Sequence, residues 1–203
     1  MENSKIQIKE TQRGFKMDVT GDEAEVVKEV FTWYEKNFQF VPNLAKVLSN
    51  SPAALRSYWL TQLELQNNGI LTPEEHNVIQ MSIAVENRCK YCASGHQMLG
   101  KAFFGSEEED LLAIRNEGSI PSEKFDALRS FALKVYRNQG RVSDKAIRDF
   151  ESVGYTKAQA VEVVTNIAAK VMSNFTNQLA MTEVDEPVQP FAKGLFDNEK
   201  AYR

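Results

Sequence analysis

Two cysteines and a histidine lie close together in one short segment, Cys89-Lys-Tyr-Cys92-Ala-Ser-Gly-His96. On a helix, where successive residues turn by about 100°, Cys89, Cys92 and His96 fall on one face. Two thiols separated by one turn can form a disulfide, and the imidazole can take a thiol proton or stabilise a thiolate. Since the chain has no other cysteine, we predict that this pair forms a reversible intramolecular disulfide that His96 tunes.

The position of the cysteines within their helix bears on their reactivity. Asn87 has the side chain of an N-cap residue, so we expect both cysteines in the first turns of a helix that begins there. The positive end of the helix dipole favours the thiolate, which is the reactive form of cysteine. Cys92 has the nearer histidine, whereas Cys89 is nearer the helix start. We predict that Cys92 attacks, because a proton acceptor one turn away also helps during the attack.

Two other interpretations of this segment remain open. The cysteines could be small buried hydrophobic residues without redox chemistry. Alternatively, Cys89, Cys92 and His96 could bind zinc with His76 or Glu86 as a fourth ligand, although structural zinc sites usually take ligands from separated segments. We favour the redox interpretation, and we predict no metal site and no cofactor.

His76 and Glu86 precede the cysteines on the same stretch of chain. His76 falls in the first turn of its helix, and we expect a surface or packing residue rather than a ligand. Glu86 ends an apolar stretch on the side shared by Ile79 and Ile83. A carboxylate there could be half-buried with a raised pKa, or it could lie at a solvated helix end. We favour the solvated helix end and keep Glu86 as a possible supporting residue.

The residues before the cysteines predict a helix over residues 73–86. Thr72 and Glu75 can form a capping box, and Pro73 suits the first helical position. Residues 78–85 are almost all apolar, which predicts a central, buried helix. We expect the cysteine helix to follow at once, over residues 87–104, and to end at Gly105.

Helical periodicity and capping residues account for the rest of the chain, and no region is rich in strand signals. We therefore predict an all-α fold, a compact helical bundle. Further helices are expected from about residue 22 and over 44–48, 52–67, 106–116, 125–135, 143–150 and 157–180. We divide the chain into an N-terminal arm (1–20), a single helical domain (21–186) and a C-terminal tail (187–203) that wraps the domain or docks a partner.

Composition and charge narrow the classes of partner. The chain has 203 residues and a formal net charge of −4, and it has no basic block. We therefore predict neither a nucleic-acid partner nor a membrane partner. No apolar run is long enough to span a bilayer, and the first residues lack the apolar core of a signal peptide. We expect a cytoplasmic protein whose thiols rest in the reduced state.

The stretch over residues 75–96 resembles the carboxymuconolactone decarboxylase-like superfamily, specifically its alkyl hydroperoxidase D-like branch. The sequences Phe40-Val-Pro-Asn-Leu44 and Asn174-Phe-Thr-Asn177 also resemble that branch. The resemblance implies an all-α fold of packed helices that assembles into homo-oligomers. It further implies reduction of a hydroperoxide substrate by the cysteine pair. One thiolate attacks the peroxide, the sulfenic acid condenses with the other thiol, and a dithiol reductant restores the pair.

Cys89, Cys92 and His96 match the cysteines and the histidine of that branch, but two nearby positions differ. Asn77 stands where the family has a proton-relay glutamate, and Tyr91 stands where the best-studied members have a histidine. We keep both as possible supporting residues, although an amide and a high-pKa phenol weaken the relay. Two alternative functions remain: a redox sensor or disulfide-exchange protein, and a non-catalytic helical oligomer that binds a ligand.

Overall fold

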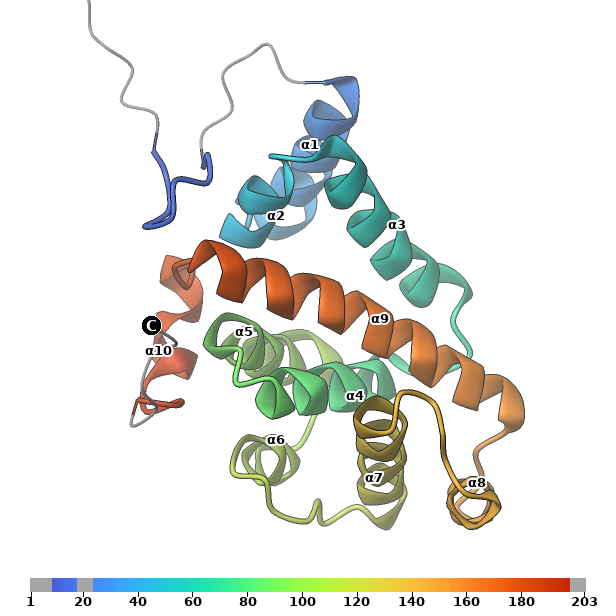
Figure 1. Cartoon of the computed structure of the whole chain (residues 1–203). Helices are drawn as coiled ribbons and strands as arrows, with labels where there is room; N and C mark the ends of the chain where they lie inside the picture. Colours follow the sequence, from blue (N-terminus) through green and yellow to red (C-terminus); the bar gives the residue numbers. More distant parts are fainter. Residues whose placement is uncertain (1–8, 18–23, 198–203) are drawn as a thin grey trace, which may run out of the picture.

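A computed structural model of the chain describes residues 9–17 and 24–197. Apart from an isolated bridge between Glu10 and Lys16, the regular elements in these ranges are helical, which confirms the predicted fold class (Figure 1). The α-helices are α1 (Glu25–Phe38), α2 (Asn43–Leu48), α3 (Pro52–Asn68), α4 (Pro73–Glu86), α5 (Lys90–Leu99), α6 (Glu108–Arg115), α7 (Glu123–Arg137), α8 (Asp144–Ser152), α9 (Lys157–Ala180) and α10 (Gln189–Ala192). Of the helices described, none combines the length and the apolar character needed to cross a membrane.

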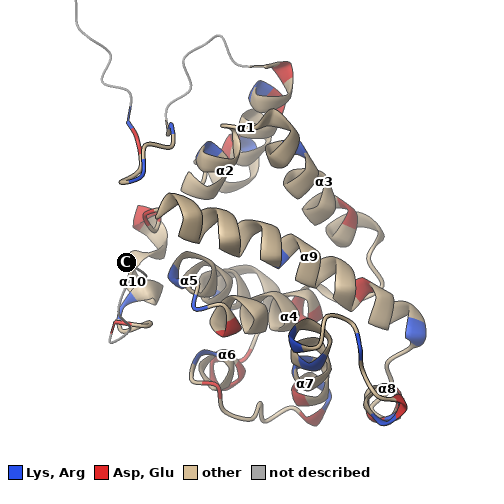
Figure 2. Cartoon of the chain, in the orientation of Figure 1, with Lys and Arg blue, Asp and Glu red and all other residues tan. Residues whose placement is uncertain are grey.

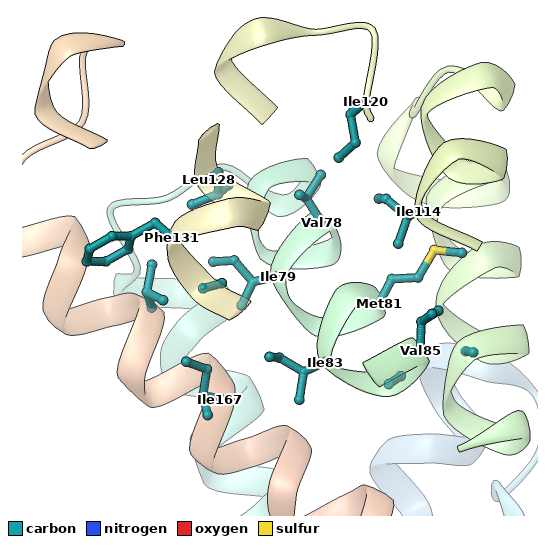
Figure 3. Packing of buried hydrophobic residues seen from close by; sticks show 14 of the residues in the cluster. Val78, Ile79, Met81, Ile83, Val85, Ile114, Ile120, Leu128, Phe131 and Ile167 are labelled. Atoms are coloured by element: carbon teal, nitrogen blue, oxygen red, sulfur yellow. The ribbon is translucent and has the colours of Figure 1, made fainter. Parts of the chain in front are cut away.

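Helix α4 is the central helix of the fold, and its bounds are those predicted. Thr72 and Glu75 form the predicted capping box, and every residue from Glu75 to Val85 is buried. A helix that is apolar nearly all round is stable only when other helices surround it. Its neighbours include α5, α6, α7 and α9. Figure 3 shows α4 side chains facing Ile114 of α6, Leu128 and Phe131 of α7, and Ile167 of α9.

The buried side chains form two large clusters, one on each side of α9. One cluster contains buried residues of α4, α5, α6 and α7, and the other contains buried residues of α1, α2 and α3. Helix α9 packs against both α4 and α3. Figure 1 shows it crossing the molecule between the two groups of helices. Residues at the junction of the two clusters therefore come from segments far apart in the sequence.

The turn between α4 and α5 differs from the sequence prediction. Asn87 is the C-cap of α4, and α5 begins at Lys90 with Cys89 in the N-cap position. The Asn87 side chain donates to Asn174 Oδ1 (3.0 Å) and accepts from the Tyr136 hydroxyl (2.6 Å). The prediction that Asn87 caps the cysteine helix is wrong, because its side chain is bonded to α7 and α9.

The far end of the cysteine helix agrees more closely with the prediction. Helix α5 continues into a π-helical turn, Gly100–Phe104, and the helical stretch ends at Gly105, which has φ +68°. A left-handed glycine is a common end for a helix because it has no Cβ to clash with the preceding turn. The helical segment that carries the cysteines thus ends where the sequence indicates, although it starts later.

Both ends of the described chain pack against the helical body. In the N-terminal stretch, Met17 is buried beside Val47 of α2 and Ala180 of α9. In the C-terminal stretch, a 3-10 turn (Glu186–Val188) leads into α10, which packs against α5. Residues 1–8, 18–23 and 198–203 lie outside the described ranges, and the division into arm, domain and tail stays a prediction.

Candidate functional site

Cys92 lies in the first turn of α5, where polar side chains of α9 surround its sulfur. Asn177 Nδ2 donates a hydrogen bond to Cys92 Sγ (3.2 Å), and Ser173 Oγ lies 3.9 Å from the same sulfur. Cys89 lies within hydrogen-bonding reach of Cys92. Both thiols are free and buried, with 2% of Cys89 and 4% of Cys92 exposed. The structure therefore brings the two predicted cysteines together as neighbouring thiols.

The two thiols have opposite acid–base properties. Burial raises the pKa of Cys92, but the hydrogen bond from Cys89, the charge of Lys170 and the Asn177 amide together lower it from 9.0 to about 6. The hydrogen bond to Cys92, reinforced by burial, raises the pKa of Cys89 well above its ordinary value. At neutral pH the pair is therefore a Cys92 thiolate that accepts a hydrogen bond from the Cys89 thiol. This asymmetry favours Cys92 as the nucleophile, because the thiolate is the reactive form.

The positive charge beside the thiolate comes from Lys170, in the middle of α9. Only 1% of this residue is exposed. Burial lowers its pKa, and the charges of Cys92 and Cys89 oppose that shift. Sequence reasoning missed Lys170, although a signal is present: it is the only charged residue between Glu162 and Glu183. A single lysine in a long apolar helix is either a solvated side chain or a buried charge with a partner.

His96 links Lys170 to Asn77. The imidazole Nε2 lies 2.7 Å from Lys170 Nζ, and Nδ1 lies 2.9 Å from Asn77 Oδ1. Because an ammonium can only donate, Nε2 accepts, and the ring proton is on Nδ1, where Asn77 accepts it. Burial, together with the Lys170 charge, lowers the pKa of His96 well below 6.5. The ring is therefore neutral and both nitrogens have partners, so Lys170 rather than His96 compensates the Cys92 thiolate.

Asn77 is held in a tight place beside the π-helical turn. Only 1% of Asn77 is exposed. A Cβ atom at Gly100 would lie 2.7 Å from Asn77 Nδ2 and 2.7 Å from Leu111 Cδ2, which is closer than such atoms approach. Gly100 has an ordinary helical φ of −56°, so glycine is needed here for space. This close fit fixes the amide that sets the tautomer of His96.

Tyr91 is bonded away from the cysteines. Its hydroxyl donates to the Asp185 carboxylate and accepts from the backbone amide of Leu44 (3.1 Å). Burial, and then the nearby Asp185 charge, raise the pKa of Tyr91 well above 10.0. Tyr91 therefore stays protonated at neutral pH and ties α5 to α2 and to the segment after α9.

Glu86 lies at a partly exposed helix end, as favoured from the sequence. It accepts two hydrogen bonds from Arg137, at 2.7 Å from Nε and 2.6 Å from Nη2. The Arg137 guanidinium lowers the pKa of Glu86, so the alternative of a raised pKa is wrong. The structure does not bring Glu86 into the cysteine site.

His76 is a buried packing residue. Its Nδ1 lies 3.1 Å from Asn166 Oδ1, and its Nε2 lies 3.3 Å from Glu162 Oε1. Within residues 9–17 and 24–197, no three His, Cys, Asp or Glu side chains are placed to hold a metal ion together. The polar partners of His76 lie on α9 and those of Glu86 on α7, away from the cysteine pair.

A cleft of about 590 Å³ leads to the cysteine site from the side of α1 and α3. Cys92, His96 and Lys170 lie along it, next to Tyr91 and Asn77. Its other walls are mostly apolar and include six aromatic side chains: Trp33, Tyr34 and Phe38 of α1, Trp59 of α3, and Phe103 and Phe104 of the π-helical turn. A small or medium organic molecule would meet apolar walls before it reached the sulfur.

Comparison with solved structures identifies the fold. The chain superposes with a TM-score of 0.77 on the alkylhydroperoxidase AhpD core of an uncharacterized peroxidase-related protein from Ralstonia eutropha JMP134, at 18% identity over 87% of this chain and 94% of that chain. The chain has the alkylhydroperoxidase AhpD fold. A peroxidase-related protein from Silicibacter sp. TM1040 matches with a TM-score of 0.72, at 14% identity over 85% of this chain and 91% of that chain.

The AhpD fold also occurs in a debrominase. A variant of the debrominase Bmp8, in complex with 2,3,4-tribromopyrrole, matches with a TM-score of 0.71 at 15% identity, over 88% of this chain and 96% of that chain. No protein-family model and no curated protein sequence matches the chain. In this example of the AhpD fold, a stabilised thiolate and a neighbouring thiol can together carry out a two-electron reduction that ends in a disulfide.

Proposed function

We propose that this protein reduces organic hydroperoxides with Cys92 as the attacking thiolate and Cys89 as the resolving thiol. The observation that carries the proposal is the opposite pKa shift of the two cysteines. A thiolate at neutral pH attacks a peroxide oxygen, and a neighbouring protonated thiol supplies the hydrogen that leaves with the sulfenic oxygen as water. The AhpD fold shared with peroxidase-related proteins supports the same chemistry.

The cleft supports an organic hydroperoxide as substrate. Several aromatic residues line the cleft beside Cys92, and burying an apolar body against them favours binding by roughly 25 cal/mol per Å². Hydrogen peroxide has no such body and gains nothing from these walls. Because both sulfurs are buried, the dithiol reductant must be small enough to enter the cleft. A reducing cytoplasm, the location expected from the sequence, would supply such thiols.

The aromatic walls favour a second candidate, reductive removal of a halogen from an aromatic ring. The debrominase with this fold was solved with a brominated pyrrole. In this chain, the Cys92 thiolate would take the halogen as a cation, the ring carbon would take a proton, and Cys89 would displace halide as the disulfide forms. A disulfide-exchange or sensor role with a protein partner fits less well, because a protein disulfide cannot reach sulfurs that are 2% and 4% exposed.

Intact-protein mass spectrometry after one equivalent of cumene hydroperoxide tests the proposal. We expect the wild type to lose two hydrogens. Cys89→Ser should gain one oxygen as a sulfenic acid, which dimedone traps, and Cys92→Ser should not react. With dithiothreitol as reductant, only the wild type should consume cumene hydroperoxide over many turnovers. Retention of both hydrogens by the wild type would exclude hydroperoxide reduction, and sulfenic acid in Cys92→Ser alone would reverse the two roles.

We also propose that the protein assembles into homo-oligomers through the exposed face of α9. Val161, Val164, Phe175 and Leu179 of this face are 51–69% exposed, and buried Lys170 is the only charged residue between Val164 and Leu179. A contiguous apolar stripe of this kind is usually covered by a partner. Light scattering at micromolar concentration should give a mass well above 23.0 kDa, and Val164→Asp should reduce it. A wild-type mass of one chain would contradict the proposal.

A further inference from the structure

Lys170 is a buried cation, and its charged partners among the described residues can themselves be titrated. Its Nζ donates to the neutral His96 ring and lies 6.0 Å from the centre of the Tyr58 ring. The charges that act on its pKa are those of Cys92 and Cys89, with no carboxylate among them. A buried ammonium is strongly disfavoured unless an anion compensates it. The charge on Lys170 and the charge on Cys92 therefore support each other.

This mutual dependence has a consequence for the redox cycle. When Cys92 is oxidised to a disulfide, its negative charge disappears. Lys170 then loses the charge that opposes the effect of burial on its pKa, and burial favours its neutral form. Consumption of the thiolate therefore favours departure of the proton that Lys170 carries.

We propose that Lys170 is the proton store of the dithiol cycle: it holds the proton that leaves Cys92 and gives it to the oxygen that leaves the oxidant. The inference rests on the proposed hydroperoxide chemistry for its substrate, but the proton store itself works with any two-electron oxidant. One N–H bond of Lys170 is fixed to His96 Nε2. Lys170 and Cys92 line the same cleft, where the oxygen of an oxidant would enter.

Each step of this cycle balances. The Cys92 thiolate attacks the terminal oxygen of ROOH, which gives Cys92–SOH and RO⁻, and the Lys170 ammonium protonates RO⁻ to ROH. The Cys89 thiol then attacks Cys92–SOH, which gives the disulfide and water. A dithiol reduces the disulfide and leaves both cysteines as thiols, and the neutral Lys170 amine takes the proton of Cys92. No proton is exchanged with the solvent in the oxidation.

The Asn77–His96 pair positions the proton store. Asn77 accepts the Nδ1 proton, so Nε2 always offers Lys170 a lone pair and never a competing positive charge. The titratable groups around Lys170 are few: Tyr58 comes from α3, and Cys89, Cys92 and His96 belong to the α5 segment. Tyr91, bonded to Asp185, lies on the other side of Cys92. Helix α4 contributes the uncharged Asn77.

Proton uptake during oxidation tests the proposal. The reduced protein is oxidised by diamide, and separately by cumene hydroperoxide, at pH 7.5 in weak buffer with a pH indicator. We expect the wild type to take up no proton per disulfide. Lys170→Arg keeps a cation that cannot release its proton, so it should take up about one proton per disulfide. Uptake of one proton by the wild type, or of none by a Lys170→Arg variant whose Cys92 is a thiolate at 240 nm, would overturn the proposal.

A second variant covers the case in which arginine does not fit the site. Lys170→Met keeps the length and apolar stem of the side chain but carries no charge. Cys92 alkylation by iodoacetamide should then move to higher pH, with a rate at pH 7 at least about tenfold lower than in the wild type. An unchanged pH profile would overturn the proposal. Diamide and iodoacetamide need no hydroperoxide, so inertness toward cumene hydroperoxide would count against the proposed function and leave this test intact.

Discussion

Two charged sites at opposite ends of α4 show how burial changes what a charge can do. At the C-terminal end, Glu86 and Arg137 are partly exposed and paired, with side chains 22% and 57% exposed. In the N-terminal half, Asn77 accepts a hydrogen bond from His96, and His96 in turn contacts Lys170, which is 1% exposed. Figure 2 shows that charged residues gather on α6, α7 and α8, whereas α9 has few.

The difference lies in the partner of each charge. Arg137 lowers the pKa of Glu86 and Glu86 raises that of Arg137, so both remain charged at any ordinary pH. Lys170 is compensated by a thiolate that exists only in the reduced protein and only above about pH 6. A charge with a permanent partner contributes to structure, whereas one with a reactive partner responds to pH and oxidation.

The largest expected effect concerns stability at the buried site. The pKa of Cys92 falls from 9.0 to about 6 on folding, so between these values the unfolded chain binds one more proton. The contribution is fully present above pH 9 and is lost as the pH falls through about 6. The free energy of unfolding of the reduced wild type should therefore rise, relative to the double variant Cys92→Ser/Lys170→Met in which neither group is charged, by on the order of 1 kcal/mol per pH unit over this range.

Urea denaturation under a reductant, at several pH values between about 5.5 and 9, measures this difference. Glu86→Gln is the matched control at the exposed site and should follow the pH dependence of the wild type. Parallel curves for the wild type and Cys92→Ser/Lys170→Met would mean that Cys92 is not an anion in the folded protein.

A smaller effect is expected at His96 when the neutral amide of Asn77 becomes a carboxylate. Asn77→Asp keeps the size of the side chain and places a negative charge next to Nδ1. An opposite charge at hydrogen-bond distance stabilises imidazolium, so the pKa of His96 should rise by at least about one unit. NMR spectra recorded over a range of pH measure the pKa of His96. The chain has only two histidines, and the variant His76→Gln identifies which signal belongs to which. The idea fails if His96 of Asn77→Asp titrates as in the wild type.

The smallest effect should follow removal of the exposed charge. Glu86→Gln breaks a pair that is largely solvated, and such pairs contribute about 0–1 kcal/mol. Its urea midpoint should shift only slightly, and its rate of Cys92 alkylation should stay within about twofold of the wild type because the site is not part of the cysteine environment. A tenfold change in the alkylation rate would show that the two ends of α4 are coupled.

The sequence predicts those parts of the fold that depend on neighbouring residues. The signals that predict α4 are local in sequence: the capping box of Thr72 and Glu75 is followed directly by the apolar stretch. The start of α5 was predicted wrongly because Asn87 is bonded to side chains 87 and 49 residues away. No local signal distinguishes an N-cap asparagine from one that faces two distant helices.

The site follows the same rule. Cys89, Cys92 and His96 are recognisable from their spacing, but Lys170 meets His96 across 74 residues of sequence. Its role depends on burial, which a lysine in a helical pattern does not reveal. From the sequence alone, Asn77 is interpreted as a position that has lost the relay carboxylate of the family that the chain resembles. In the structure its amide oxygen accepts the Nδ1 proton of a His96 ring that burial and the Lys170 charge keep neutral.

The lack of space at Gly100 separates what can drift in this protein from what cannot. A Cβ at Gly100 would force Asn77 and Leu111 to shift. Three residues further on, Phe103 is 64% exposed and forms part of the cleft wall. Substitutions in the wall of the cleft can therefore alter substrate preference with little effect on Asn77, whereas a substitution of Gly100 would disturb the amide that holds His96.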